Sequence, residues 1–426
     1  MSTLAIYLGL FGVFFALGSP IVLSLAISAI IMLQINGIDL TVFASKFMVS
    51  MDNFSLTAMF FFILAGEIMN GGGMTRRIVA VVSKAVKNIP GGLAIIAIIS
   101  CGIFAAINGS AIATMIAISA ILYPAMVKDG YPPAFAAACL AAGGVVGPII
   151  PPSIPMIVYG SATGDSIAAL FSGGVVLGIL ICGAEIFVVY FISKKRGYGG
   201  KTDTTTEFGS TKGVLWALLF PIIIFVSIVT GAMTATETSA FAVVYAFVIG
   251  QFVYKEFDIK QLSTMMRKSM KSSGTIMAIV GAASAVAWIL TYNRVPQMVT
   301  EAMVASISSK SVFMVVTFFI LFLVGMIMDL TPAIMILTPI FMGPVAAFNI
   351  DPVFFGVFFC AVLTAGLITP PVGTLIYLGC SQAKKSFGEM VKQLLPFVLA
   401  VYVVLFIVAL VPQIITFLPK NVFKLY

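Results

Sequence analysis

Histidine is absent from this chain of 426 residues, and only 9% of its residues are charged, against about 25% in soluble domains. The missing histidine excludes Ser-His-Asp triads, haem with a histidine ligand and most zinc sites. The cysteines stand singly, with no CxxC pair, and are predicted to be small apolar packing residues; they are Cys101, Cys139, Cys182, Cys360 and Cys380.

Long polar segments are also lacking, since the longest runs only from Lys194 to Lys212. Hydrophobic residues make up 61% of the chain, compared with about 45–50% in soluble domains. Long apolar runs between the charges predict an all-α polytopic membrane protein whose environment is the lipid bilayer. The net charge of +8 is explained by basic cytoplasmic loops, so no nucleic-acid partner is expected.

The apolar runs divide into two classes by length. Nine are predicted to cross the membrane: 3–33, 54–70, 133–161, 166–193, 214–231, 236–254, 272–292, 352–379 and 394–418. The run 91–125 is too long for one crossing and too short for two, which need roughly 20 residues each plus a turn. The run 311–348 is borderline by length, and its match to 91–125 in the internal repeat described below favours the same assignment. We therefore expect each of these two runs to form a re-entrant hairpin.

Nine crossings place the two termini on opposite sides of the membrane. With the N-terminus inside, only five of the 23 Lys and Arg residues fall outside, and the other 18 face the cytoplasm. This asymmetry predicts a cytoplasmic N-terminus and an external C-terminus. The five external residues are Lys46, Arg294, Lys310, Lys420 and Lys424.

Two nearly identical segments lie 219 residues apart, Gly147-Pro148-Ile149-Ile150-Pro151-Pro152-Ser153 and Gly366-Leu367-Ile368-Thr369-Pro370-Pro371-Val372. Proline lacks an N–H and clashes with the preceding helical turn, so each pair is expected to break its helix. The two broken helices are 133–161 and 352–379. Matching breaks in two halves of a membrane protein point to a transporter binding site.

The same offset relates the rest of the chain, and maps Pro133 onto Pro352. The expected repeats are 17–199 and 236–418, each with four crossings and one hairpin. A single linker helix, 214–231, then inverts the second repeat relative to the first. This pattern is typical of an inverted-topology repeat.

Polar residues mark the expected hairpin tips, which contain Asn108, Ser110 and Thr114 in one half and Asp329 and Thr331 in the other. Such residues favour caps and turns. A helix N-terminus at a turn presents free N–H groups, and the preceding C-terminus presents carbonyls to a cation. Carbonyl, hydroxyl and carboxylate oxygens suit Na⁺, so we expect ion binding as well as capping.

Asp329 is the sharpest single candidate, because a carboxylate within an apolar run is costly unless it is paired, protonated or beside a cation. No Lys or Arg lies within eighteen residues of it, so its partner is a bound ion or a distant helix. Glu67 is expected to pair with Arg76 or Arg77. Glu185 is predicted to face a partner subunit or to reach the interface.

The helix breaks supply further candidate ligands. Freed carbonyls near Gly147 and Gly366 are expected to complete ion sites. The hydroxyls of Ser153, Thr369 and Thr374, with that of Thr114, are candidates to face a polar substrate. Glu237, in Thr234-Ala235-Thr236-Glu237, is expected to cap a helix.

These motifs also carry a resemblance over essentially the whole chain. Leu64-Ala65-Gly66-Glu67-Ile68-Met69-Asn70, the Asn108-Gly109-Ser110 tip, both Pro-Pro breaks and Met328-Asp329-Leu330-Thr331-Pro332 together resemble the large membrane subunit of tripartite ATP-independent periplasmic (TRAP) transporters. The resemblance implies an elevator-type transporter that takes up organic acids with Na⁺ across a bacterial inner membrane. C4-dicarboxylates and sialic acid are the commonest substrate classes it suggests.

The resemblance further implies two partners, a small four-helix membrane subunit and a soluble periplasmic binding protein. On matching positions it places Na⁺ near Asn108, Ser110, Gly147 and Pro152 in one half. In the other half it places Na⁺ near Asp329, Thr331 and Gly366. Because Ser110 corresponds to Asp329 across the repeat, the two ion sites are expected to differ in charge.

Two alternatives remain open at this point. A stand-alone Na⁺/dicarboxylate symporter of similar fold would need no binding protein. An intramembrane aspartyl protease would need a second aspartate facing Asp329, and Thr163-Gly164-Asp165 is only a fragment of the required Gly-x-Gly-Asp motif. We therefore predict a transporter and not an enzyme.

Overall fold

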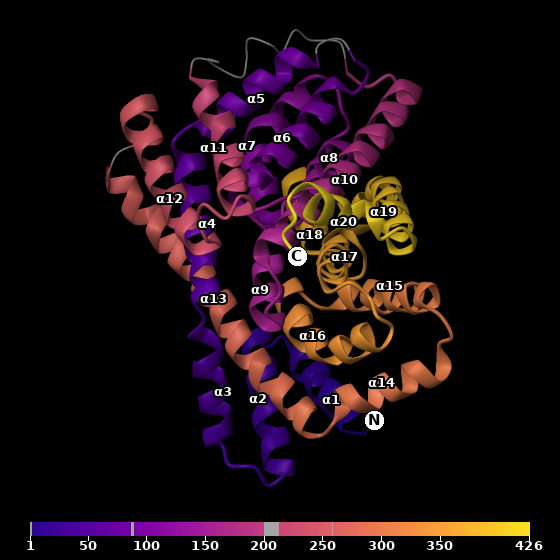
Figure 1. Cartoon of the computed structure of the whole chain (residues 1–426). Helices are drawn as coiled ribbons and strands as arrows, with labels where there is room; N and C mark the ends of the chain where they lie inside the picture. The colour runs from indigo at the N-terminus through magenta and orange to yellow at the C-terminus, as the bar shows by residue number, and fades with distance from the viewer. Residues whose placement is uncertain (1, 87–88, 200–212, 258) are drawn as a thin grey trace.

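The computed structural model describes residues 2–86, 89–199, 213–257 and 259–426, and every regular element in these ranges is helical (Figure 1). The predicted all-α class is confirmed. Eight of the described helices are long and apolar enough to cross a membrane. Lys87 and residues 200–212 of the expected polar loop lie outside the described residues.

The first half runs from the N-terminus to the long helix α10. Its helices are α1 (Ser2–Ala16), α2 (Ile21–Ile35), α3 (Thr41–Met51), α4 (Phe54–Gly71), α5 (Met74–Ala85), α6 (Gly92–Asn108), α7 (Ala111–Lys128), α8 (Pro133–Val145), α9 (Ile154–Thr163) and α10 (Ile167–Arg196). The α6–α7 hairpin occupies the run predicted at 91–125, and α8 and α9 are the two parts of the first broken helix.

The second half follows the connecting helix α11 (Val214–Val229). Its helices are α12 (Ala235–Val248), η2 (Ile249–Tyr254), α13 (Ile259–Tyr292), α14 (Val295–Ser306), α15 (Lys310–Ile327), α16 (Leu330–Ala347), α17 (Pro352–Ala365), η3 (Gly366–Ile368), α18 (Thr374–Ala383), α19 (Phe387–Leu410), α20 (Gln413–Phe417) and η4 (Leu418–Val422). The α15–α16 hairpin matches the run predicted at 311–348.

Helix boundaries in the two halves follow the offset of 219 closely. Shifted by that number, α7 begins at 330 and ends at 347, which are the ends of α16. Shifted α8 covers 352–364, against Pro352–Ala365 for α17, and shifted α9 covers 373–382, against Thr374–Ala383 for α18. Local chain geometry therefore repeats, while the inverted orientation of the two halves stays a prediction.

The two helix breaks form where the Gly and Pro residues predicted them. Val146 to Ser153 separates α8 from α9, and the Ser153 hydroxyl accepts a hydrogen bond from the Met156 N–H to begin α9. In the second half the chain leaves η3 at Thr369 and re-enters a helix at Thr374. The first break is buried apart from Ile150, whereas the second is buried at Thr369 and Gly373 and exposed at Pro371. Irregular backbone at membrane depth is tolerated where it is buried in protein or lines a cavity.

The structure corrects two of the predicted crossings. Residues 3–33 are not one helix, because Gly18 adopts φ +79° and Pro20 precedes α2, which separates it from α1. The crossing predicted at 394–418 ends early, since α19 stops at Leu410 and Pro412 begins α20. In Figure 1 the N-terminus lies toward the end of the molecule opposite α5. The side of the membrane that each terminus faces stays a prediction.

Length does not separate hairpin arms from crossings as clearly as expected. Helices α7, α15 and α16 have 18 residues each and are apolar enough to cross, and an 18-residue helix is roughly 27 Å long. The two runs do form helical hairpins, with tips at Gly109 and Met328. Their re-entrant course stays a prediction.

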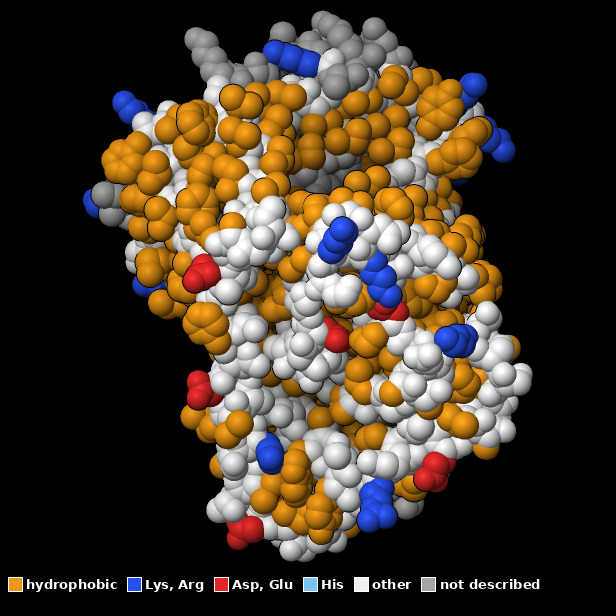
Figure 2. All heavy atoms as spheres, viewed as in Figure 1, with side chains coloured by type: hydrophobic (Ala, Val, Ile, Leu, Met, Phe, Trp, Pro, Cys, Tyr) orange, Lys and Arg blue, Asp and Glu red, His pale blue; other side chains and the backbone are white. Residues whose placement is uncertain are grey.

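The surface suits a bilayer environment. Figure 2 shows hydrophobic side chains concentrated on the upper part of the visible face and in patches below it, and the charged side chains of described residues that are visible near the upper end are basic. Large apolar residues project from α10, including Ile179 and Phe187, and from α19, including Leu399 and Val403. Exposed apolar surface of this extent marks contact with lipid or protein.

Candidate functional site

The first hairpin tip is a compact turn built by Asn108, Gly109 and Ser110. Gly109 adopts φ +64° and ends α6, and the Ser110 hydroxyl accepts from the Ala113 N–H to begin α7. The Asn108 Oδ1 atom accepts from the Ser110 N–H at 2.8 Å and from the Thr114 hydroxyl at 3.3 Å. The predicted capping at this tip is thus observed.

Close backbone contacts hold this tip against the first helix break. A Cβ atom on Gly109 would overlap the carbonyl oxygen of Pro152, and one on Gly147 would lie 2.9 Å from the carbonyl oxygen of Ser110. Glycine is therefore required at both positions, because no side chain fits between the segments. The structure brings Asn108, Ser110, Gly147 and Pro152 together, and the Na⁺ that the resemblance places near them stays a prediction.

The second tip uses a carboxylate. Asp329 precedes α16, and its Oδ1 atom accepts from the Leu330 N–H at 2.9 Å. Near this tip α15 contacts the second break through backbone: the Val372 N–H donates to Met326 O at 3.3 Å, and a Cβ on Gly366 would overlap the Gly325 oxygen. The second tip and second break therefore also form one packed unit.

Both tips meet at a pocket of about 500 Å³ that opens between α9, α13 and the two hairpins. Four residues predicted from the sequence line it, Ser110, Asp329, Thr331 and Thr374. The Thr374 hydroxyl oxygen is buried and has no hydrogen-bond partner among the described residues. A buried polar atom without a partner indicates a place where a ligand or water is expected to bind.

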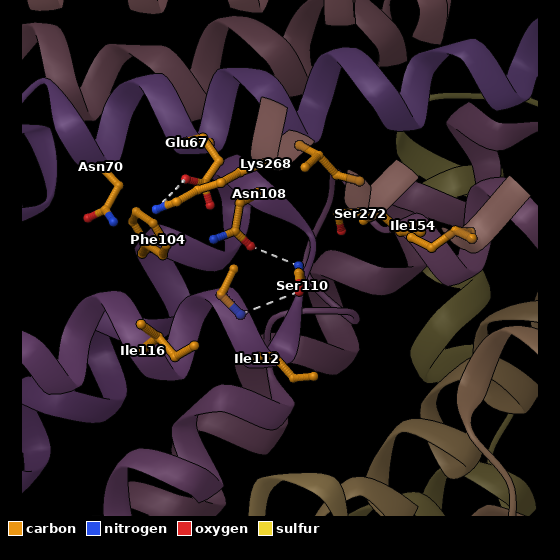
Figure 3. Close-up of a pocket in the computed structure, with 14 residues that line it drawn as sticks. Glu67, Asn70, Phe104, Asn108, Ser110, Ile112, Ile116, Ile154, Lys268 and Ser272 are labelled. Atoms are coloured by element: carbon orange, nitrogen blue, oxygen red, sulfur yellow. Dashed lines mark hydrogen bonds and ion pairs between the residues drawn. The ribbon is translucent and has the colours of Figure 1, made fainter. Parts of the chain in front are cut away.

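A second pocket, of about 370 Å³, continues from the first along α4 and α13. Figure 3 shows Glu67 and Asn70 of α4, Asn108 and Ser110 of the tip, and Lys268 of α13 around it. Lys268 lines both pockets. Its Nζ atom lies 4.0 Å from Glu67 Oε2, and the two side chains are 67% and 30% exposed, so both charges face the cavity.

The remaining predicted ligands do not reach the lining of either pocket. Thr114 is buried and donates to Asn108, and Ser153 is buried and donates to the carbonyl oxygen of Pro148. The Thr369 hydroxyl donates to Ala365 O and lies 3.2 Å from the Tyr402 hydroxyl. The structure thus gives all three hydroxyl groups partners within the chain, and their contact with a substrate stays a prediction.

The sequence reasoning missed the contribution of α13. Four of its polar side chains line the larger pocket: Lys268, Lys271, Ser272 and Thr275. Their spacing of three and four residues places them along one helix face. The signal for this contribution is a run of Lys, Ser and Thr inside a long helix, and its lysines are among the 18 basic residues predicted to face the cytoplasm.

Three acidic residues can now be placed. Glu67 pairs with Lys268, and so the expected pairing with Arg76 or Arg77 is wrong; Arg77 instead lies 2.6 Å from Glu256. Glu185 is fully buried, which excludes exposure at a subunit or lipid interface, and neither of its oxygens has a hydrogen-bond partner among the described residues. Glu237 forms the predicted cap with Thr234.

With this geometry in place, comparison with known proteins is decisive. Residues 8–414 match the model of the family described as the tripartite ATP-independent periplasmic transporter, DctM component. The chain belongs to this family. The predicted resemblance is confirmed, and the chain is a permease subunit of a membrane transporter and not an enzyme.

Two relatives within the family cover most of the chain. The 2,3-diketo-L-gulonate TRAP transporter large permease protein YiaN of Escherichia coli is 35% identical over 94% of this chain and 95% of its own length. The C4-dicarboxylate TRAP transporter large permease protein DctM of Pseudomonas aeruginosa is 34% identical over 88% of this chain and 89% of its own length.

A solved structure agrees with the fold. The YdaH transporter of Alcanivorax borkumensis superposes with a TM-score of 0.64 at 12% identity, over 87% of this chain and 86% of that one. At this identity the likeness concerns the fold alone.

The aspartyl protease alternative would need Asp165 to face Asp329, and the structure keeps the two apart. Asp165 follows the C-terminal end of α9, whereas Asp329 shares a pocket with Ile154 at the N-terminal end of that helix, roughly 15 Å away along its axis.

Proposed function

We propose that this TRAP permease subunit couples Na⁺ entry to the uptake of an organic acid by symport. The observation that carries the proposal is the pocket where the two hairpin tips meet. It combines one carboxylate, Asp329, with the hydroxyl residues Ser110, Thr331 and Thr374 and with two lysines of α13. Oxygen ligands suit a hard cation, and lysines attract a carboxylate.

Na⁺ is assigned to the tips, since oxygen atoms gather there. Asp329 uses one carboxylate oxygen to cap α16, which leaves the second as a candidate ligand. At the first tip, Ser110 lies against the Gly147 backbone and Gly109, beside Asn108, lies against Pro152, so side-chain and carbonyl oxygens can share an ion. Thr331 and the Gly366 backbone are the corresponding candidates in the second half.

The organic acid is assigned to the α13 side of the pocket, where Lys268 and Lys271 lie. The named relatives transport 2,3-diketo-L-gulonate or C4-dicarboxylates, and sialic acid is a further candidate. All of these acids carry a carboxylate that a lysine can bind. In this arrangement the acid and Na⁺ occupy neighbouring positions, and each stabilises the other electrostatically.

The transport step proposed is an elevator movement of the hairpins and broken helices, arranged as an inverted repeat. Its support is the backbone packing that joins each hairpin to the neighbouring break. The location proposed is a bacterial inner membrane, with the N-terminus cytoplasmic and the C-terminus periplasmic. The partners proposed are a small four-helix membrane subunit and a periplasmic substrate-binding protein, in keeping with the tripartite family description.

Reconstitution into proteoliposomes tests this function. Uptake of a panel of labelled carboxylates is measured with and without an inward Na⁺ gradient, and with and without the small subunit and the binding protein. We expect uptake to need Na⁺ and all three proteins. Equal uptake with a K⁺ gradient would overturn the Na⁺ assignment, and uptake by this chain with Na⁺ alone would favour the stand-alone symporter.

A further inference from the structure

A third cavity, the α3–α4 cavity, has a volume of about 300 Å³ and lies where α3 meets α4, beside α9, α13 and α16. It includes Ser161 near the C-terminal end of α9, whereas the pocket of the hairpin tips includes Ile154 at the N-terminal end. The two residues are roughly 10 Å apart along the helix. Helix α3 also lies toward the end of the molecule opposite the basic helix α5 (Figure 1). In the proposed orientation, with Lys46 of α3 outside, the cavity therefore faces the periplasm.

The internal repeat relates the α3–α4 cavity to the two pockets beside the tips. The offset of 219 pairs four of its lining residues with residues that line those pockets: Val49 with Lys268, Asp52 with Lys271, Asn53 with Ser272, and Met335 with Ile116. The cavities are therefore counterparts in the two halves, but they differ in charge. Two lysines of α13 line the pocket of the tips, whereas Asp52 lines the α3–α4 cavity and none of the described residues around it is a Lys or Arg.

The polar groups of the α3–α4 cavity are oxygen atoms with open coordination. Asp52 is exposed and takes part in none of the ion pairs formed among the described residues. Thr338 of α16 is 2% exposed, and its hydroxyl oxygen has no hydrogen-bond partner in the described part of the chain. A buried polar atom without a partner indicates a place for a ligand or water. Ser50 and Ser161 each donate to a backbone carbonyl of their own helix, which leaves their oxygen lone pairs available to a cation.

We propose that the α3–α4 cavity binds a hydrated Na⁺ on the external side, as a loading position for the ions assigned to the hairpin tips. This inference rests on the proposed function for its Na⁺ coupling and its orientation. A carboxylate and hydroxyl oxygens suit a hard cation, and Asp52 would repel an organic acid. Because a water molecule occupies about 30 Å³, the cavity has room for the ion with part of its hydration shell.

The remaining lining strengthens the attraction of Asp52 for a cation. Apolar residues, among them Val280, Met335 and Met342, form much of the wall. A charge in a cleft with apolar, low-dielectric walls has a focused field and raises the local concentration of counter-ions. The cavity would therefore concentrate Na⁺ at the entrance, before the ion reaches a hairpin tip.

Helix α16 connects the loading position with the second tip. Thr338 lies nine residues after Asp329, which is half the length of this 18-residue helix and roughly 14 Å along its axis. Because the loading position uses none of the oxygens assigned to the tips, its loss should alter how much external Na⁺ is needed. The rate of uptake at saturating Na⁺ should not change.

The test measures the external Na⁺ concentration that gives half-maximal uptake, in proteoliposomes that contain all three proteins, with the labelled acid that the panel identifies. In Asp52→Asn, which preserves the size of the side chain, we expect this concentration to rise about threefold at low ionic strength, as for a partly exposed charge. The increase should largely disappear in about 1 M choline chloride, because charges are then screened beyond about 3 Å. Maximal uptake should equal that of wild type.

Two further variants make the result decisive. Thr338→Val removes the unpaired hydroxyl with little change in shape and should raise the half-saturating Na⁺ concentration about twofold, even if Asp52→Asn does not insert into the membrane. Glu301→Gln is the matched control, since it removes an exposed acid on α14 outside this cavity, and should leave the value unchanged. An unchanged value in both cavity variants, or an equal increase in Glu301→Gln, would overturn the inference.

A measurement without transport separates this inference from the proposed function. Thermal unfolding of the detergent-solubilised complex with the small subunit is followed in NaCl and in choline chloride at equal ionic strength, because a bound ion stabilises the folded state. We expect a smaller Na⁺-specific stabilisation in Asp52→Asn than in wild type. That result with Na⁺-independent uptake would retain the cation site and reject the coupling. Na⁺-dependent uptake with identical Na⁺ responses in wild type and Asp52→Asn would reject only this inference.

Discussion

The two hairpin tips occupy matching positions in the two halves but use different chemistry. The first tip is neutral, with Asn108 Oδ1 accepting two hydrogen bonds and Gly109 in a left-handed conformation. The second has Met328 at φ −107°, followed by Asp329. The same helix boundaries are thus reached through different local interactions. Two hairpins at matching positions can therefore have one charged and one uncharged tip.

The largest expected effect comes from removing the charge of the second tip. Asp329→Asn keeps a side chain that can cap α16 but loses the anion proposed to hold Na⁺. We expect Na⁺-dependent uptake to fall by about two orders of magnitude, or about 3 kcal/mol, as for a charged hydrogen-bonding partner. Proteoliposome uptake measures this loss, and Asp329→Ala should behave similarly.

Normal uptake with unchanged Na⁺ dependence in either Asp329 variant would contradict the ion-site assignment. Thermal unfolding in detergent serves as the control, because both variants are expected to fold.

The next prediction compares the backbone conformations of the two tips. Gly109→Ala places a Cβ on the Pro152 carbonyl oxygen at φ +64°, so we expect the free energy of unfolding to fall by about 2–3 kcal/mol. Met328→Ala, at the corresponding position, needs no unusual backbone and should cost less than about 1 kcal/mol. Thermal unfolding compares the two variants, and equal losses would contradict the predicted difference between the tips.

A smaller effect concerns Glu185 of α10, whose counterpart in the second half is Val404. Both Glu185 oxygens are buried without a partner, and so the neutral, similarly shaped Glu185→Gln should raise the free energy of unfolding by about 1 kcal/mol. Uptake by this variant should match wild type. A folded Glu185→Gln protein without transport would instead give this residue a functional role.

The smallest effect is expected at Ser110, the counterpart of Asp329. Ser110→Ala removes one hydroxyl from the first tip, and a neighbouring carbonyl or water can replace it in part. We expect the Na⁺ concentration for half-maximal uptake to rise about threefold, well below the effect at Asp329. A loss as large as that of Asp329→Asn would show that the two tips contribute equally.

The features predictable from sequence were those that depend on residues close together in the chain. Asn108-Gly109-Ser110 and the two Pro-Pro segments act on their own backbone, so the turns and breaks appear where they were expected. The break at Gly18 and Pro20 had the same local signal and was overlooked inside a continuous apolar run. Pro412 was overlooked for the same reason.

The features that sequence could not supply depend on how helices rotate and pack. Lys268 lies 201 residues after Glu67, and nothing local to Glu67 favours that partner over Arg76 or Arg77. Which face of α13 lines the pockets is set by its contacts with α2, α3, α4 and α16. The burial of Glu185 likewise depends on the helices packed around α10.

The glycine contacts have a mechanical consequence for ion release. Gly109 meets Pro152, Gly147 meets Ser110, and Gly366 meets Gly325, in each case through main-chain atoms. No rotating side chain at these three joints can act as a gate, because each joint consists of backbone. An ion held there would be released only when a hairpin tip and the neighbouring helix break move apart as whole segments, so the backbone contacts themselves would control its release.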